Sequence, residues 1–256
     1  MTIYRPPPPL ASLVDFLWES RSYVQPHRAE RVLPTGAMDL VIDLTADAGQ
    51  CGTLSGARSA FFLLDTSRPR EFIGARFTIG GGFAFFGPAG ALRDRRVPLE
   101  TLWGRAALEL QERLAGAAPG PPRFTVLERF LLYHLDRERR PHPAVRHALL
   151  RLRRSGGSTS IGALADACGL SRRYFIEVFR DQVGLTPKLY GRLRRFRRSL
   201  AALGDVQEID WADLAIACGY SDQPHFIHDF RAFTGLTPSI YLRNRTASVN
   251  HVRDPG

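Results

Sequence analysis

The sequence is poor in cysteine and has no long apolar run. Its three cysteines are odd in number and lie far apart, which argues against a disulfide framework. No apolar run approaches the roughly 18 residues of a membrane-spanning helix. The N-terminal stretch "MTIYRPPPPLASL" lacks the apolar core and small-residue cleavage site of a signal peptide. We therefore expect a cytoplasmic protein without a membrane partner.

The sequence also lacks the motifs of common enzymes and cofactor sites. It has no GxSxG around a serine, no recognisable pair of catalytic carboxylates and no GxGxxG spacing. The glycine-rich stretch "GGGFAFFG", which begins at Gly80, is expected to be a turn or bulge between strands. Two groups of possible metal ligands lack the further donors of a closed zinc site: His27 with Cys51, and His225 with His228 and Asp229. We expect no enzyme, no metal site and no cofactor.

Positive charge is in excess and is unevenly distributed. The chain of 256 residues holds 35 Lys+Arg and 25 Asp+Glu, which gives a formal net charge of +10. Residues 141–256 hold 17 of the basic and 10 of the acidic residues, so +7 of this excess lies there. A basic C-terminal half suggests a polyanion as partner.

The first hundred residues have the pattern of strands. Stretches rich in β-branched and aromatic residues, punctuated by Gly and Pro, predict strands within 31–44, 60–65 and 71–87. The tetraproline at 6–9 is expected to be a short extended lead-in. Aromatic side chains in these strands can line a pocket or fill a solid core: Phe61, Phe62, Phe72, Phe77, Phe83, Phe85 and Phe86.

From about residue 98 the pattern changes to that of helices. Apolar residues recur three and four apart in "LWGRAALELQERLAG" and "RFTVLERFLLYHLDRERR". The stripe of Leu127, Phe130 and Leu131 can pack on the chain's own β domain or on a second copy, so a homodimer through this region is possible. A third helical stretch ends at Gly156-Gly157, which we expect to be a hinge.

These patterns predict an α+β fold class with three parts. They are a β-rich, barrel-like sensor domain at 1–100, a helical connector and possible dimerisation region at 101–155, and an all-α domain at 156–256. The all-α domain is expected to hold two helix-turn-helix units joined by a linker helix.

The basis for the two units is a segment of about 27 residues that occurs twice. The copies are "LADACGLSRRYFIEVFRDQVGLTPKLY" and "LAIACGYSDQPHFIHDFRAFTGLTPSIY". In each copy a short helix ends at a glycine, Gly169 or Gly219, and a capping residue, Ser171 or Asp222, begins the next helix. Helix, glycine-containing turn and second helix is the order of a helix-turn-helix unit.

The second helix of each copy has an apolar face and a polar face. At about 100° per residue, Phe175 and Phe179 face the core in one copy, as do Phe226 and Phe230 in the other. The opposite side and its flanks carry groups that suit base edges, since Arg pairs with guanine, Glu with cytosine and Gln with adenine. An ordinary solvated face is the alternative. These positions are Arg172, Arg173, Ile176, Glu177, Arg180, Gln223, Pro224, Ile227, His228 and Arg231.

Between the copies, residues 187–203 predict an amphipathic linker helix. Its apolar stripe consists of Leu189, Leu193, Phe196 and Leu200. Such a helix spans about 25 Å, enough to place two reading helices near one DNA turn, about 34 Å, apart. Arginines crowd its other side and are either solvated or bound to phosphate, with Arg192 and Arg195 as the predicted phosphate contacts.

These motifs resemble the AraC/XylS family of bacterial transcription regulators over about residues 156–256. The resemblance implies a DNA-binding transcription regulator that reads adjacent major grooves of double-stranded DNA, with RNA polymerase as a further partner. It implies that the inserted residues are Arg172, Arg173, Ile176 and Glu177, then Gln223, Pro224, His225 and His228. Pro224 departs from the family pattern because it has no side-chain donor, which predicts weak readout there.

The first hundred residues resemble, more faintly, the β-rich sensor domains that precede this module in relatives. That resemblance implies control by a small-molecule effector, whose identity it does not give. Two alternatives stay open: a domain that only dimerises or contacts proteins, and an enzyme fused to a DNA-binding module. Activation and repression are not distinguished.

Overall fold

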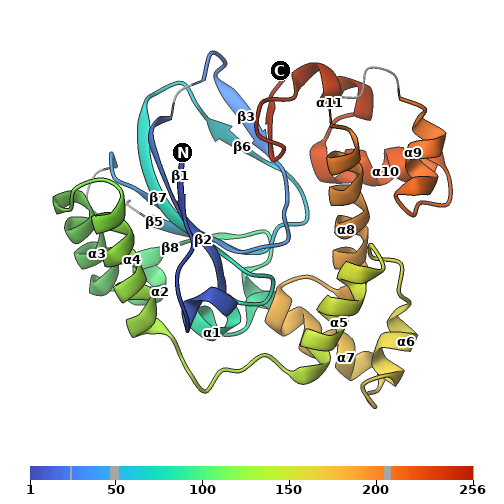
Figure 1. The fold of residues 1–256 in the computed structure, drawn as a ribbon, viewed down its shortest axis with the longest axis horizontal. Helices are drawn as coiled ribbons and strands as arrows, with labels where there is room; N and C mark the ends of the chain where they lie inside the picture. Colours follow the sequence, from blue (N-terminus) through green and yellow to red (C-terminus); the bar gives the residue numbers. More distant parts are fainter. Residues whose placement is uncertain (24, 47–51, 205–208, 256) are drawn as a thin grey trace.

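The computed structural model describes residues 1–23, 25–46, 52–204 and 209–255 of the chain. Figure 1 shows the strands of the N-terminal part on one side and the helices of the C-terminal part, coloured yellow to red, on the other. Two green helices lie on the outer side of the strands. This arrangement confirms the predicted α+β class, with a β-rich part first and an all-α part last.

The larger sheet has six antiparallel strands in the order β1-β2-β7-β4-β5-β8. These are β1 (Thr2–Tyr4), β2 (Val14–Tyr23), β7 (Arg70–Phe77), β4 (Asp39–Asp43), β5 (Gly52–Ser55) and β8 (Arg96–Pro98). The pairing of β2 with β7 places Leu17 opposite Ala75, both of them buried. Since β1 and β8 are edge strands, the sheet is not closed, and the expected barrel-like form applies only loosely.

The long strand β2 was not predicted, because a charged residue interrupts its apolar alternation. Glu19 lies in β2 at a buried position. Arg123 neutralises it, with Nη1 2.7 Å from Glu19 Oε1 and 2.8 Å from Glu71 Oε1. Burial alone would lower the pKa of Arg123, but its hydrogen bonds to Glu71 and Glu19 raise that pKa above its usual value. The partner that makes Glu19 tolerable is 104 positions away in the chain, beyond the reach of a local pattern.

Three helices cover the sheet. They are α2 (Leu99–Trp103), α3 (Arg105–Gly116) and α4 (Pro121–His134). On α4, the stripe of Leu127, Phe130 and Leu131 is buried in one core with the sheet residues Leu17 and Leu40. Of the two partners left open for this stripe, the chain's own β domain covers it in the structure, and dimerisation through this region stays a prediction.

The glycine-rich stretch is not a turn between strands. A short helix, α1 (Phe83–Phe86), follows the glycines at once, and a 3-10 helix, η2 (Ala89–Leu92), comes next. The glycines permit close packing: a Cβ at Gly81 would lie 2.2 Å from the Leu13 carbonyl oxygen, and one at Gly82 would lie 2.6 Å from Met38 Sδ. A second 3-10 helix, η1 (Leu10–Ser12), follows the tetraproline, so the lead-in turns rather than staying extended.

The C-terminal helices share a second core. They are α5 (Pro143–Arg154), α6 (Ile161–Asp166), α7 (Arg172–Val183), α8 (Pro187–Ala202), α9 (Trp211–Ala217), α10 (Gln223–Thr234) and α11 (Pro238–Asn244). Buried residues of α5, including Val145 and Leu152, lie in this core with Phe175 and Phe196. The expected connector 101–155 is thus divided, because α3 and α4 pack on the sheet whereas α5 packs with the helix-turn-helix units. We propose a domain boundary between His134 and Pro143.

The glycine pair Gly156-Gly157 is a tight helix end and does not have the form of the expected hinge. The Gly157 amide donates to the Leu152 carbonyl at 2.8 Å, and Gly157 has φ +92°. A Cβ on Gly157 would lie 2.2 Å from the carbonyl oxygen of Gly191 in α8. The pair therefore lets α5 cross α8 at close range, which fixes the two helices together.

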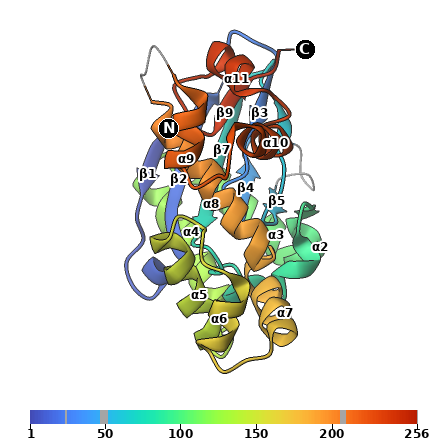
Figure 2. The same cartoon turned by 90° about the vertical axis from the view of Figure 1, so that its right-hand side faces the viewer.

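A smaller sheet joins the N-terminal part of the chain to the segment after α11. It has the order β6-β3-β9, formed by β6 (Phe62–Asp65), β3 (Ala29–Val32) and β9 (His251–Arg253). β9 pairs antiparallel with β3 and places Arg31 opposite Val252, which is fully buried. Figures 1 and 2 both show β9 and β3 side by side. The C-terminal helical unit is thus attached to the N-terminal part by a shared sheet.

Candidate nucleic-acid interface

Each helix-turn-helix unit begins its second helix at the predicted cap. Ser171 Oγ accepts from the Tyr174 amide, and Asp222 Oδ1 accepts from the His225 amide at 2.7 Å. The preceding glycines, Gly169 at φ +64° and Gly219 at φ +88°, are left-handed, as the sharp turns require. The caps chosen from the sequence are confirmed, including the shifted one in the second copy.

The recognition helices α7 and α10 lie toward opposite ends of α8 (Figure 2). Phe175 and Phe179 of α7, and Phe226 and Phe230 of α10, are fully buried, as expected. Among the predicted DNA contacts, the exposed residues are Arg172, Arg173, Glu177, Arg180, Pro224, His228 and Arg231. Those that are partly buried are Ile176, Gln223, His225 and Ile227. Both helices therefore present polar side chains to solvent over a buried aromatic face.

On α7, Arg173 and Glu177 form an exposed ion pair of 3.2 Å, one turn apart. Exposed pairs of this kind contribute about 0.2–0.5 kcal/mol to stability. Contacts with DNA bases can therefore replace the Arg173–Glu177 pair at little cost. The sequence pattern missed Tyr174, whose side chain is 49% exposed beside Arg173. Its ring meets His142 edge-on at 6.5 Å, which places it on the flank of α7 toward α5.

On α10, His225 is directed toward its own unit. Its Nδ1 lies 3.1 Å from Ser221 Oγ, and its ring meets Tyr220 edge-on at 5.2 Å. On its other side, Nε2 lies 4.0 Å from Oδ2 of the buried Asp229. This position agrees with the helical angle of His225, which places it beside the core face, and base contact by His225 remains a prediction.

Arg192 joins the linker helix to α10. Its Nε and Nη2 lie 3.0 and 2.7 Å from Oδ1 of Asp229, a carboxylate that is only 1% exposed. The predicted phosphate contact at Arg192 remains a prediction, and this ion pair gives the residue a role in stability as well. A buried charge without a partner is costly, so Arg192 is required where Asp229 is buried.

Arg195 is also engaged inside the unit. Its Nη1 donates to the Gly157 carbonyl at 3.1 Å, and its guanidinium lies 5.4 Å from the centre of the Tyr220 ring. Burial raises the pKa of the Tyr220 phenol. Arg195 thereby connects the end of α5 to the turn of the second unit, and its contact with phosphate stays a prediction.

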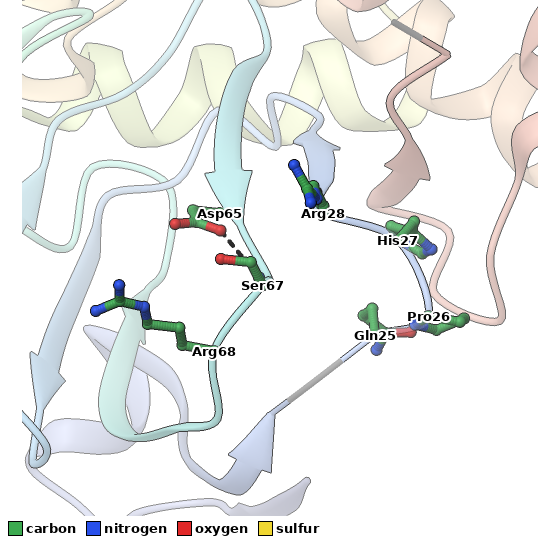
Figure 3. A pocket seen from close by; sticks show the side chains of 7 residues that line it. All are labelled: Gln25, Pro26, His27, Arg28, Asp65, Ser67 and Arg68. Carbon is green, nitrogen blue, oxygen red and sulfur yellow. Dashed lines mark hydrogen bonds between the residues drawn. The ribbon is translucent and has the colours of Figure 1, made fainter.

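The N-terminal part has an open, polar hollow at one end of the small sheet (Figure 3). Its volume is about 510 Å³, and it is lined by Gln25, Pro26, His27, Arg28, Asp65, Ser67 and Arg68. Pockets that bind drug-sized ligands are lined mostly by apolar side chains, whereas this hollow is polar. The aromatic residues that were expected to line strands are packed together, since Phe77 of β7 lies 5.1 Å from Phe85 and 5.4 Å from Phe86 of α1 between ring centres. These three rings belong to the packed core.

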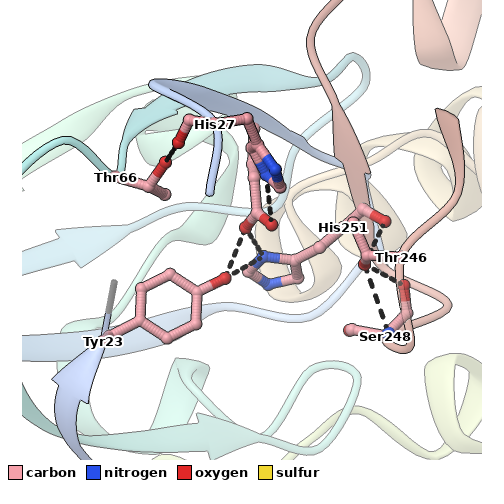
Figure 4. A network of polar contacts seen from close by, with 7 residues as sticks. Tyr23, His27, Thr66, Thr246, Ser248 and His251 are labelled. Carbon is pink, nitrogen blue, oxygen red and sulfur yellow. Dashed lines mark hydrogen bonds and ion pairs between the residues drawn. The ribbon is translucent and has the colours of Figure 1, made fainter. Parts of the chain in front are cut away.

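Next to this hollow, a buried carboxylate connects β3 to β9 (Figure 4). Glu30 is 1% exposed and lies 2.8 Å from His251 Nδ1 and 2.9 Å from His27 Nε2, and Tyr23 donates a short hydrogen bond to it. Burial alone would raise the pKa of Glu30, but the hydrogen bonds from His251, Tyr23 and His27 outweigh it and lower that pKa to about 2. Burial and the contact with Glu30 raise the pKa of Tyr23.

Two further features concern the described part of the chain only. No helix there is long and apolar enough to span a membrane. No group of three or more His, Cys, Asp or Glu side chains there could hold a metal ion. One of the two possible metal-ligand groups considered from the sequence is His27 with Cys51. Its Cys51 lies outside the described residues.

Comparison with known proteins agrees with this geometry. A family model described as a helix-turn-helix domain matches residues 164–244, and a domain of unknown function (DUF6597) matches residues 2–98. The HTH-type transcriptional regulator Rv1931c of Mycobacterium tuberculosis is 34% identical over 92 residues, which are 35% of this chain and 34% of that protein. The probable transcriptional regulator LumQ of Photobacterium leiognathi is 28% identical over 82 residues, which are 32% of this chain and 33% of that protein. Residues 164–244 therefore form a helix-turn-helix domain.

The similarity outside the helix-turn-helix domain is limited. The chain spans about one third of the length of the two curated relatives. The C-terminal domain of AraT, a response regulator from Geobacillus stearothermophilus, shares 22% identity at a TM-score of 0.38, over 43% of this chain and 91% of that one. ToxT from Vibrio cholerae shares 11% identity at a TM-score of 0.42, over 89% of this chain and 93% of that one. TM-scores this low support no further conclusion.

Proposed function

We propose that the chain is a sequence-specific transcription regulator that places α7 and α10 in successive major grooves of double-stranded DNA. The observation that carries this proposal is the pair of capped recognition helices, each with an exposed polar face over a buried aromatic one. The linker α8 has 16 residues and therefore spans about 24 Å at about 1.5 Å per residue. That length suits two reading helices about one DNA turn apart.

The exposed side chains of each helix divide the work of recognition in this proposal. In the first unit, Arg172, Arg173 and Glu177 reach base edges, and Arg180 lies farther along the groove. In the second unit, Gln223, Pro224 and His228 do so, with Arg231 one turn beyond. Bidentate base contacts contribute about 1–3 kcal/mol of discrimination each. Pro224 offers only apolar contact, so less discrimination is expected there.

The test is selection of binding sites from a random-sequence duplex pool by the full chain. We expect Arg173→Ala to relax base preference in one half of the selected site and His228→Ala in the other. Arg154→Ala, which removes an exposed arginine of α5, is the control and should preserve both preferences. Equal loss of affinity for every sequence by both variants would refute the assignment of base readers, and failure to enrich any duplex would refute the function.

The N-terminal domain is proposed to receive a small-molecule effector. The polar hollow beside Glu30 supports this, because it adjoins the sheet that joins the two parts of the chain. The packed rings of Phe77, Phe85 and Phe86 favour the second candidate, a domain that acts only through protein contacts. Thermal unfolding of the full chain with a metabolite library separates them, since a ligand that binds the folded state raises the Tm.

Contact with RNA polymerase and formation of a homodimer are also proposals. A homodimer needs a surface other than the buried stripe on α4. Sedimentation of the full chain, alone and on a selected duplex, tests the oligomeric state directly.

A further inference from the structure

A basic surface of the N-terminal domain lies beside the first recognition helix. It comprises the exposed Arg93, Arg95 and Arg96 at the junction of η2 and β8, together with the partly buried Arg58. Asp94 is the acidic residue within this run, and it forms a 3.1 Å ion pair with Arg93. We call the three exposed arginines the η2–β8 arginine patch. The sequence reasoning missed them because the excess charge as a whole lies in the C-terminal half.

The patch is held near α7 by close backbone packing. η2 contacts α7, and a Cβ on Gly90 of η2 would lie 3.3 Å from Asp181 Oδ1 and 3.6 Å from Arg180 Cγ. At the end of α7, Gly184 is left-handed, and a Cβ there would lie 3.2 Å from the Ala89 carbonyl oxygen. Glycines thus remove the bulk that would otherwise separate η2 from α7. Arg180, one of the exposed side chains of α7, therefore lies next to the 3-10 helix that leads directly into the patch.

The loop that carries the patch has a defined conformation. Asp94 accepts from the Ser59 amide at 2.6 Å and from Ser59 Oγ at 2.7 Å. The Arg95 carbonyl accepts from the Gly56 amide at 3.0 Å, and β8 pairs with β5. A loop held in this way presents its charges without a large further loss of conformational entropy on binding.

The arginines of the patch differ in how many contacts they already make within the protein, and therefore in how readily they can bind an anion. Two guanidinium groups lie over the Phe62 ring. That of Arg96 is 5.7 Å from the ring centre, and that of Arg58 is 4.7 Å from it. Within the described residues, Arg93 is paired with the exposed Asp94 alone. For Arg95, the described residues provide no ion-pair partner. Like charges this close repel one another, and a polyanion placed across them would relieve that repulsion.

Phosphates line both walls of a major groove, so elements that flank a recognition helix can reach them. In some helix-turn-helix proteins the C-terminal end of the recognition helix itself contacts the backbone. Here that end of α7 carries Arg180 and adjoins η2. We propose that Arg93, Arg95 and Arg96 bind the DNA phosphate backbone beside the groove that α7 reads. This inference rests on the proposed function, and it makes the N-terminal domain part of the DNA interface.

The opposite possibility is that η2 and β8 obstruct DNA. The charge of the patch argues against this, because an obstructing surface would repel DNA best if it were acidic. The two ideas predict opposite effects of removing the arginines: weaker binding if the patch contacts phosphate, and tighter binding if it obstructs.

The experiment measures salt dependence with the full chain. The probe is a fluorescent duplex of about 40 base pairs, roughly four helical turns, selected from a random pool by the unaltered chain. The test variant carries Arg93→Ser, Arg95→Ser and Arg96→Ser. The control variant carries Arg21→Ser, Arg113→Ser and Arg129→Ser, three exposed arginines on β2, α3 and α4. Both variants lose the same net charge, so any difference between them depends on position.

We expect the test variant to reduce the slope of log K against log salt by about 2–3, since each phosphate that is no longer neutralised reduces it by about 0.9. The control variant should change the slope by less than about 0.9. Arg95→Ser alone, which removes no packed side chain, should reduce the slope by about 0.9 and tests the proposal if the triple variant folds poorly. Equal slopes for test and control variants, or tighter binding by the test variant, would overturn the proposal.

A fourth variant separates this proposal from the proposed function. Arg172→Ala with Arg173→Ala should lose preference for the selected duplex over a scrambled one, whatever the patch does. If that preference is lost while the patch variant binds as the control does, the regulator proposal stands and the patch proposal fails. If the unaltered chain enriches no duplex, both fail.

Discussion

Glu30 and His251 lie 221 positions apart in the chain, yet Oε2 of one is 2.8 Å from Nδ1 of the other. The contact joins β3 of the N-terminal domain to β9, beyond the last helix of the helix-turn-helix domain. Beside it, Arg31 Nε lies 2.7 Å from Asp254 Oδ1. The attachment of the two domains is therefore polar and specific as well as apolar, and it can be tested by substitution.

Glu30→Gln should destabilise the chain in a manner that depends on pH. The folded state lowers the pKa of Glu30 from 4.5 to about 2, so the ionised carboxylate stabilises the fold above pH 4.5. That contribution is lost as pH falls from 4.5 toward 2, and it amounts to roughly 3 kcal/mol at about 1.4 kcal/mol per pKa unit. Thermal unfolding between about pH 3 and 7 should show the largest difference between the variant and the unaltered chain at neutral pH.

Glu109→Gln is the control for that series. Glu109 is 59% exposed and pairs with Arg105 on the surface of α3, so its replacement should change the Tm little at any pH. A gap between Glu30→Gln and the unaltered chain that stays constant across the acid range would contradict the role assigned to the Glu30 carboxylate.

Val252→Ala should loosen the attachment of β9. Val252 is fully buried against the helical core, and its truncation should lower the free energy of unfolding by about 1–3 kcal/mol, as buried large-to-small changes do. Val249→Ala is matched to it, because Val249 lies in the same tail and is 50% exposed. Chemical denaturation of both variants gives the comparison. Similar losses at the two positions would show that burial of Val252 contributes nothing.

Gly157→Ala should be strongly destabilising. The added Cβ would meet the Gly191 carbonyl oxygen at 2.2 Å, and φ of +92° is unfavourable for alanine. We expect a loss of more than about 1 kcal/mol, measured by chemical denaturation, since strain and overpacking act together. Gly162→Ala, in α6 with open space around it, should stabilise by up to about 1 kcal/mol. If position 157 accepts alanine freely, the region is a mobile hinge after all.

Arg192→Ala distinguishes a structural arginine from a phosphate contact. It would leave the buried Asp229 carboxylate without its ion-pair partner, so the Tm should fall by several degrees, equivalent to about 1–3 kcal/mol for an unsatisfied buried acceptor. Arg192→Ala combined with Asp229→Asn should recover part of that loss. Weaker DNA binding with an unchanged Tm would instead identify Arg192 as a phosphate contact alone.

The parts of the fold that the sequence predicted are those with local causes. A cap, a left-handed glycine and a buried aromatic pair recur within a dozen residues, so both helix-turn-helix units could be placed together with Ser171 and Asp222. The pattern also predicted the apolar stripe of α8, in which Leu193, Phe196 and Leu200 are buried.

What the sequence did not predict depends on partners far away in the chain. Glu19 in β2 needs Arg123, and the stripe on α4 needs the sheet that covers it. From the sequence alone, Arg192 is interpreted as a free basic side chain, because its ion pair with Asp229 forms only in the folded chain. β9 has three residues, too few for any period to be visible, and only β3 makes it a strand.

The small sheet also constrains how the chain is made. β3 and β6 can pair early, since Ala29 and Asp65 are near in the chain, but the third strand is at residues 251–253. At synthesis rates of about 5–20 residues per second, β3 waits roughly ten to forty seconds for β9. During that interval the β3 edge has unpaired backbone groups, which makes it a site where a nascent chain can associate with another strand. The docking of the two domains through this sheet therefore follows the synthesis of residue 253, well after β3 and β6 can pair.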